Sequence, residues 1–226
     1  MESNIEINVI NPKEYEKQAC RLLEEKYGES FEILHYGGWD WMSDSYKVVA
    51  YALEYPDILF EAEIKTDGTS MYDEYICARV CRKIEDLIET NIEDLPGYNQ
   101  LKVLPLFKRV QSVDADMSVE EFFEQNQKNR YAVYLGYSPQ IKDVKAVSGQ
   151  IAGAFENLEF MSGNIQLYLM EEDKLKEMQT YLEENAKIYY AFEELMEEAT
   201  NIVIPFEKGK IQITEEKFEE EAGDKV

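Results

Sequence analysis

Apolar residues recur at helical spacing near the start of the chain and predict an amphipathic helix over about residues 12–27. Asn11 is a favoured N-cap residue, Pro12 suits the first helical position, and Glu14 completes a capping-box pattern. Gly28 is expected to end the helix, because glycine readily adopts the left-handed backbone that often follows helices. One face of this helix should therefore be buried.

The next runs have the pattern of strands. They are FEILHY from Phe31, SYKVVAYAL from Ser45 and ILFEAEIK from Ile58. The third run alternates apolar with mostly polar residues, as a strand with one buried face does. The sequence YPD at residues 55–57 is typical of a turn, and a second helix is predicted over about residues 71–89. These elements form an α-β-β-β-α module with helices on one face of a strand meander.

A less regular segment around Pro96-Gly97 follows, and a second module is predicted beyond it. Its first strand lies in LKVLPLFKRV, where Pro105 indicates a sheet edge or a bulge. Ser118 and Glu121 form another capping-box pattern, ahead of two phenylalanines.

The rest of the second module mixes strands and helices. YAVYLGY and IQLYLM are strand-like, and a helix is predicted between them over about residues 143–157. Gly149 and Gly153 indicate that this helix packs closely on the sheet. Residues 171–199 form one long acidic helix, or two helices broken near Asn185, and IVIPF with KIQIT predicts a terminal hairpin.

We therefore expect an α+β fold with two small modules, each an antiparallel or mixed sheet with amphipathic helices on one face. The first module covers residues 1–95 and the second covers residues 96–216. Residues 217–226 form a charged tail that should fray. A chain of 226 residues with 45% apolar content is long enough for two such modules.

Charge changes this picture most, because 47 acidic residues are set against 23 basic ones and the net charge is −24. Nucleic acids and anionic membranes are bound by lysines and arginines that neutralise them, so neither is an expected partner. A negative surface attracts cations, either metal ions or a basic protein partner. The alternative is that the charge only keeps the protein in solution.

The segments that would direct the chain to a membrane or out of the cell are missing from the pattern. No run is long and apolar enough for a membrane helix, and the first twenty residues lack the features of a secretory signal. Cys20, Cys77 and Cys81 match neither a zinc pattern nor a C-x-x-C redox pair, which favours reduced thiols. We expect a cytoplasmic protein.

Candidate catalytic chemistry is sparse. His35 is the single histidine, and its place in an alternating strand favours a packed core or edge residue over a catalytic base. Zinc sites need several His or Cys ligands, and neither a Walker motif nor a GxGxxG loop occurs, so no catalytic, metal or cofactor site is expected. Asp114 and Asp116, with Glu120, lack the glycine and later glutamate of a calcium loop.

The segment YGGWDWMSDS, residues 36–45, is the most suggestive local feature. It holds both tryptophans of the chain beside a Gly-Gly pair that should make the backbone mobile. Aromatic anchors beside flexible backbone are common in binding sites, so Tyr36, Trp39, Asp40 and Trp41 form the candidate binding surface. The alternative is that the rings cap the module's own core from a long hairpin loop.

The stretches KYGESFEIL and YPDILFEAEIKTDGTSMYDEY, with the helix that follows, resemble a module in uncharacterised proteins of Gram-positive Firmicutes. The resemblance covers roughly residues 10–90 and implies the α-β-β-β-α module but no activity. Many of those proteins are predicted lipoproteins or small cytosolic proteins. Neither a signal peptide nor a lipid-attachment cysteine is predicted from this sequence, so a surface location is not expected. The matching positions are Tyr27, Gly28, Glu29, Phe31, Pro56, Asp57, Phe60, Glu61, Asp67, Gly68, Asp73 and Tyr75.

The leading functional hypothesis is a non-enzymatic binding protein whose acidic surface docks a basic protein partner, as an immunity-type or inhibitor protein does. One alternative is a carboxylate-based hydrolase with a site between the modules. Another is a structural component whose exposed aromatic surface packs against a second copy. The sequence does not determine the oligomeric state.

Overall fold

The computed structural model describes residues 11–92, 98–105, 114, 116–126, 130–137, 149, 151–155, 158–187, 190–197 and 199–212. Contacts divide the chain into two compact units, Met1–Tyr75 and Ile76–Val226. Each unit is built on one sheet, and the expected α+β class is confirmed. The predicted boundary near residue 95 and the predicted tail at 217–226 lie outside the described residues. The division by contacts places the second helix, apart from its first residue Tyr75, in the second unit.

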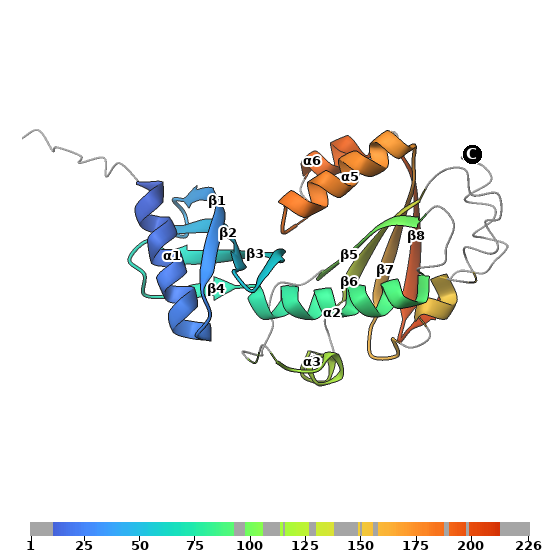
Figure 1. The fold of residues 1–226 in the computed structure, drawn as a ribbon, viewed down its shortest axis with the longest axis horizontal. Helices are drawn as coiled ribbons and strands as arrows, with labels where there is room; N and C mark the ends of the chain where they lie inside the picture. Colours follow the sequence, from blue (N-terminus) through green and yellow to red (C-terminus); the bar gives the residue numbers. More distant parts are fainter. Residues whose placement is uncertain are drawn as a thin grey trace, which may run out of the picture. The chain divides into compact units, whose positions relative to one another are not determined.

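The first unit is an antiparallel strand meander with one helix (Figure 1). Its elements are α1 (Pro12–Tyr27), β1 (Phe31–Asp40), β2 (Ser45–Ala52), β3 (Tyr55–Lys65) and β4 (Met71–Asp73), and the strands lie in that order in the sheet. The N-cap at Asn11 and the terminating glycine are as predicted, but the Asn11 side chain bonds to Lys13 and not to Glu14 as the predicted capping box requires. The Asn11 side chain accepts a hydrogen bond from the backbone N–H of Lys13, and Gly28 follows the helix with a φ of 72°.

The turn predicted at residues 55–57 was wrong. The hairpin turn is formed by Leu53 and Glu54, and β3 already begins at Tyr55. Pro56 fits within the strand because the register between β2 and β3 shifts at this point, and a proline has no N–H to give to a regular ladder.

The helix predicted from about residue 71 begins later, as α2 (Tyr75–Ile92). Met71–Asp73 instead pair with β3 and form the edge strand β4. The Asp73 carboxylate accepts a hydrogen bond from the backbone N–H of Tyr75 at 3.2 Å. This Asx-type turn redirects the chain from the strand into the helix.

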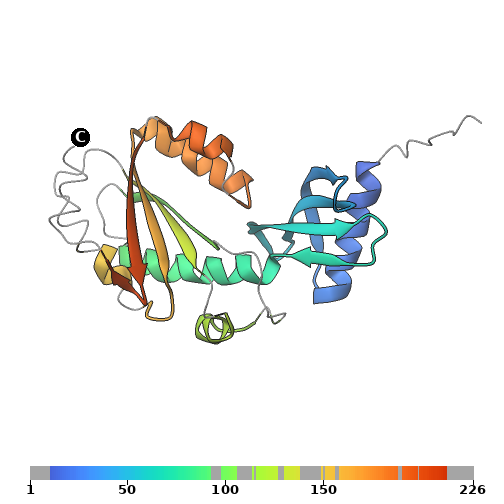
Figure 2. The same ribbon diagram turned by 180° about the vertical axis from the view of Figure 1, so that it is seen from behind.

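The second unit is a mixed sheet with helices on both faces (Figures 1 and 2). Figure 1 shows α5 and α6 on one face and α2 on the other. The strands lie in the order β5-β6-β7-β8-β9, and β6 and β7 are parallel. Its labelled elements after α2 are β5 (Tyr98–Pro105), α3 (Val119–Gln125), β6 (Tyr131–Tyr137), β7 (Gly163–Leu169), α5 (Glu172–Glu184), α6 (Tyr190–Leu195), β8 (Thr200–Glu207) and β9 (Lys210–Ile211).

Several local predictions for this unit are confirmed. Ser118 and Glu121 form the expected capping box at α3, β5 with Pro105 is an edge strand, and the acidic region is two helices separated at Asn185. The terminal hairpin turns through Lys208 and Gly209, which both have positive φ.

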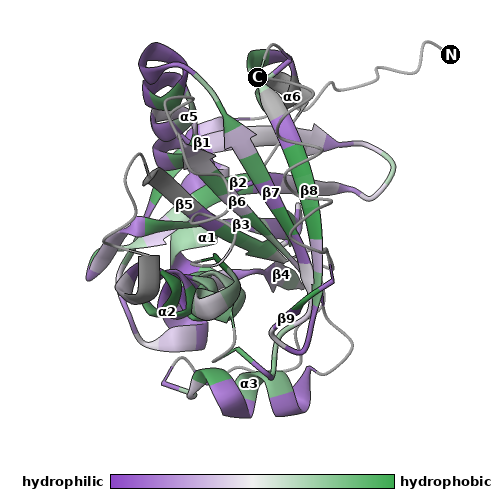
Figure 3. Ribbon diagram, turned by 90° about the vertical axis from the view of Figure 1, so that its right-hand side faces the viewer, coloured by the Kyte–Doolittle hydropathy of each residue, from purple (hydrophilic) through white to green (hydrophobic). Residues whose placement is uncertain are grey.

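Aromatic side chains pack on both sides of this sheet, and the face covered by α5 and α6 is the more polar one, with Gln166 and Asn201 joined by a hydrogen bond. Figure 3 shows hydrophobic and hydrophilic residues alternating along β7 and β8, as strands between a core and a more polar layer require. On the face covered by α5 and α6, Phe192 packs edge-on against the rings of Tyr134 and Tyr168. On the opposite face, Phe155 packs edge-on against Phe206.

The close helix packing expected at Gly149 and Gly153 was wrong. Both glycines are exposed, and a Cβ atom at either would meet no atom within 4 Å. The close approach in this unit occurs at Gly163 instead, where a Cβ atom would overlap the backbone carbonyl of Tyr131 on the neighbouring strand.

The Gly163→Ala variant is therefore expected to lose about 1–3 kcal/mol of unfolding free energy, because the β6–β7 pair must move apart to admit the methyl group. Urea unfolding followed by circular dichroism measures this loss. Gly153→Ala is the matched control and should gain up to about 1 kcal/mol, since alanine is favoured within helices. Equal stabilities for the two variants would contradict the close approach.

Candidate functional site

The β1–β2 hairpin of the first unit presents large apolar side chains to solvent at its end. Trp39 is 46% exposed, Trp41 is 74% exposed and Met42 is 78% exposed. We call these three residues the hairpin tip. The long hairpin loop considered as an alternative is not present, because β1 continues to Asp40, which pairs with Ser45 across a four-residue turn.

Side-chain hydrogen bonds support this turn. The Asp40 carboxylate accepts one bond from the backbone N–H of Met42 and one from the Ser43 hydroxyl, each 2.9 Å long. The hydroxyls of Ser43 and Ser45 are 2.5 Å apart, and Ser45 donates to the Glu63 carboxylate at 2.6 Å. The turn is thereby tied to β3, so little conformational freedom remains to be lost on binding.

Backbone contacts add to this support. The Lys65 ammonium donates to the carbonyl oxygen of Ser43, and the N–H of Thr66 donates to the carbonyl oxygen of Asp44 at 3.1 Å. Asp44 itself has a φ of 47°, which is uncommon for a residue other than glycine. The hydrogen bonds from Met42 and Ser43 lower the pKa of Asp40, so this carboxylate is ionised across the neutral range.

Tyr36 has a different environment from the other three residues of the candidate surface. Its ring stacks beside Tyr15 of α1 at 6.3 Å and Tyr46 of β2 at 6.1 Å, between ring centroids. Burial raises the pKa of the Tyr36 hydroxyl. The structure therefore brings Trp39, Asp40 and Trp41 together at the turn and places Tyr36 against the helix.

Acidic residues outnumber basic ones at this end of the sheet. The hydrogen bond from the Thr66 N–H to the Asp44 carbonyl places the β3–β4 turn beside the hairpin. Within that turn, hydrogen bonds from Thr69 lower the pKa of Asp67. The carboxylates here are Asp40, Asp44, Glu63 and Asp67, and the ammonium groups are Lys47 and Lys65.

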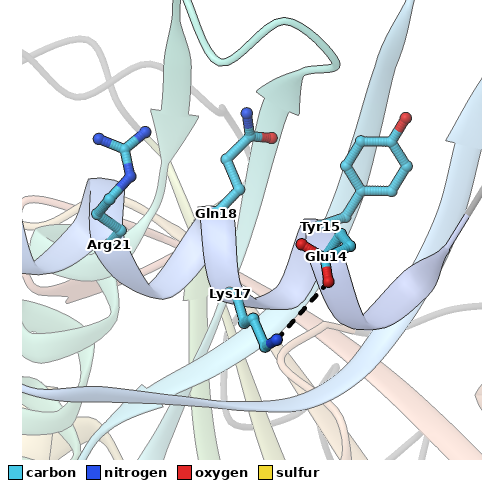
Figure 4. Close-up of a pocket in the computed structure, with 5 residues that line it drawn as sticks. All are labelled: Glu14, Tyr15, Lys17, Gln18 and Arg21. Atoms are coloured by element: carbon cyan, nitrogen blue, oxygen red, sulfur yellow. Dashed lines mark ion pairs between the residues drawn. The ribbon is translucent and has the colours of Figure 1, made fainter.

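A shallow depression lies along α1 (Figure 4). Its polar groups already have partners: Lys17 is 3.6 Å from Glu14, and the Gln18 side-chain oxygen accepts a bond from the Tyr46 hydroxyl at 2.7 Å. Arg21 donates to Glu25 at 2.8 Å. Lys17 and Arg21 therefore form ion pairs along the helix surface, and Gln18 supports Tyr46, so these side chains have structural partners.

Two carboxylates of the described residues, one in each unit, are withdrawn from solvent and paired with cations. The Asp73 side chain is fully buried, although the residue as a whole is partly exposed, and its oxygen lies 2.7 Å from the Lys26 ammonium. Glu85 is 2% exposed and lies 3.7 Å from the Lys102 ammonium and 3.4 Å from the Arg82 guanidinium. Each buried acid therefore has a cationic neighbour.

The described part of the chain contains no group of three or more His, Cys, Asp or Glu side chains that could hold a metal ion. Asp114 accepts a bond from the backbone N–H of Asp116, which lies 4.0 Å from Arg79. His35 is exposed on the edge strand β1, consistent with the edge position considered for it. Across the described helices, none combines the length and apolar character needed to cross a bilayer.

The hairpin and the two sheets define a two-unit α+β protein. Comparison with known proteins gives one similar fold and no match by sequence. No family model matches the sequence, and no curated protein matches it. The fold is similar to that of a DUF5037 family protein from Ruminococcus gnavus ATCC 29149, with a TM-score of 0.68 and 14% identity, over 92% of this chain and 99% of the other. At this identity the similarity shows the fold alone.

Ruminococcus gnavus is a Firmicute, and the structural neighbour belongs to a family without an assigned function. This agrees with the resemblance to uncharacterised Firmicutes proteins at the coarse level of fold. That the shared feature is the N-terminal α-β-β-β-α module stays a prediction.

Proposed function

We propose that this chain is a non-enzymatic binding protein that docks a basic protein partner, as an inhibitor or immunity-type protein does. The observation that carries the proposal is the placement of its acids. The net charge is −24, and Asp73 and Glu85, which are buried, are each matched by cations. A surface of this sign attracts a positively charged partner from a distance and raises the rate of encounter.

The geometry favours binding over carboxylate-based hydrolysis. A hydrolase of that kind needs two converging carboxyl groups, one of which keeps a proton because its pKa is raised. Burial raises the pKa of Glu85, but the charged groups that act on it are the cations Lys102 and Arg82 and not a second, converging carboxylate. Glu85 is therefore better explained as a structural acid than as a proton donor.

The proposal predicts salt-sensitive selection of basic sequences. We expect the immobilised protein to enrich Lys- and Arg-rich segments from a phage-displayed library of bacterial protein fragments, with affinities that fall by about tenfold or more between low and physiological salt. An unrelated acidic protein of similar net charge is the control, and fragments that it also enriches are discarded. Enrichment of neutral or acidic fragments, or binding that salt does not weaken, would contradict the proposal.

A further inference from the structure

We infer that the hairpin tip of Trp39, Trp41 and Met42 is the anchor by which the basic partner is held, and that it enters an apolar pocket rimmed by Lys and Arg side chains. The inference rests on the proposed function and adds the site and the form of the partner surface. It is carried by the exposure of the tip, by the support of the turn and by the surrounding charge.

The exposure of the tip is concentrated in a short segment. Three large apolar side chains within four positions are about half to three-quarters exposed. Tryptophan is among the residues that contribute most to binding energy at protein interfaces, and adjacent exposed apolar side chains commonly mark such interfaces. Other exposed apolar residues, such as Leu53 and Val203, lie on separate turns or strands.

The turn that carries the tip is supported by hydrogen bonds of neighbouring residues and not by the exposed rings themselves. The turn is held by the hydrogen bonds of Asp40, Ser43 and Ser45 and by the contact of Lys65 with the backbone. Trp41 and Met42 are therefore displayed on a turn that these hydrogen bonds support without a partner. A preorganised anchor of this kind lowers the entropy cost of association.

The negative charge around the hairpin tip determines which kind of partner can bind there. The four carboxylates near the tip, against two lysines, and the net charge of −24 oppose contact with a second copy or with an anionic membrane. The same charges attract a rim of Lys and Arg around an apolar pocket. An arginine in that rim can also stack on an exposed indole ring, which adds a cation–π contribution.

The two tryptophans make the test direct, because both tryptophans of the chain lie in the tip and intrinsic tryptophan emission reports on it alone. The probes are synthetic peptides of the basic fragments enriched by the whole protein. We expect each peptide that binds to shift the emission to shorter wavelength, and Trp41→Ala to weaken binding by about tenfold to a hundredfold. Leu53→Ala is the matched control: Leu53 is 52% exposed on the next hairpin turn, and its removal should leave affinity unchanged.

The outcomes separate the two proposals. If the basic peptides bind in a salt-sensitive way but neither shift the emission nor respond to Trp41→Ala, the tip is not the anchor and the proposed function still stands. If no basic fragment is enriched, both fail. An emission shift produced by zwitterionic lipid vesicles, or by raising the protein concentration alone, would assign the tip to a membrane or to a second copy and overturn the inference. Trp41→Ala should unfold at the same urea concentration as the unaltered protein, since the side chain is exposed.

Discussion

Replacing Asp73 by alanine is expected to lower the unfolding free energy of the first unit by about 2–4 kcal/mol. The buried carboxylate lies 2.7 Å from the Lys26 ammonium and accepts bonds from the Tyr27 hydroxyl at 2.6 Å and the Tyr75 N–H at 3.2 Å. These donors come from the end of α1 and from Tyr75, so one side chain joins both to β4 within the first unit. Alanine would leave the Tyr27 hydroxyl and the Tyr75 N–H without this acceptor, while the partly exposed Lys26 ammonium would turn to water.

Urea unfolding of the whole chain, followed by circular dichroism, measures the loss, and hydrogen exchange shows whether it is confined to α1 and β4. Asp73→Asn keeps the size of the side chain but removes its charge, so an intermediate loss is expected. Glu54→Ala, at an exposed turn position, is the control and should unfold as the unaltered protein does. An unchanged midpoint for Asp73→Ala would show that the three contacts do not stabilise the fold.

Elements whose start and end signals are local in the sequence were predicted well. The cap at Asn11, the glycine at Gly28 and the capping box at Ser118 act within a few residues, and the structure has each of them. Predictions failed where a partner strand decides the outcome. β4 forms because Met71–Asp73 can pair with β3. The start of β3 at Tyr55 depends on an irregular register with β2. Neither partner can be inferred from the spacing of apolar residues.

The candidate site shows the same division. The sequence drew attention to Trp39 and Trp41, which the structure shows to be exposed, but not to Met42, which is exposed as well, because a single apolar residue within a turn carries no periodic signal. The position of Tyr36 could not be predicted, since bulges in β1 shift the alternation of its side chains. The bond from Ser45 to Glu63 joins different strands, so the rigidity of the turn was also beyond the sequence.

The second large effect is expected at Glu85 of α2. Its carboxylate accepts a bond from the backbone N–H of Val103 at 2.7 Å, on the edge strand β5, and has Lys102 and Arg82 as cationic neighbours. Glu85→Ala should cost about 3–5 kcal/mol, because it leaves the Lys102 charge and the Val103 N–H without their acceptor. Urea unfolding at neutral pH measures this change, with Glu194→Gln on the exposed side of α6 as the control.

The pH dependence gives a sharper test of the same site. Burial raises the pKa of Glu85, while Lys102, the Val103 N–H and Arg82 oppose the shift. A group with a higher pKa in the folded state than in the unfolded state binds its proton more tightly when folded. Its contribution to stability is therefore full below the unfolded pKa and is lost as the pH rises through the folded pKa.

Glu85→Gln cannot titrate, so the difference in unfolding free energy between it and the unaltered protein isolates this one group. We expect the unaltered protein to gain stability relative to Glu85→Gln as the pH falls from neutral towards about 5. The Cys81 thiol lies one helical turn away and stays protonated in this range, because its bond with Cys77 and its burial raise its pKa. A constant difference across the range would mean that burial and the opposing cations balance at Glu85. A difference that moves the other way would mean that the cations dominate and that Glu85 stabilises the edge of β5 as an anion.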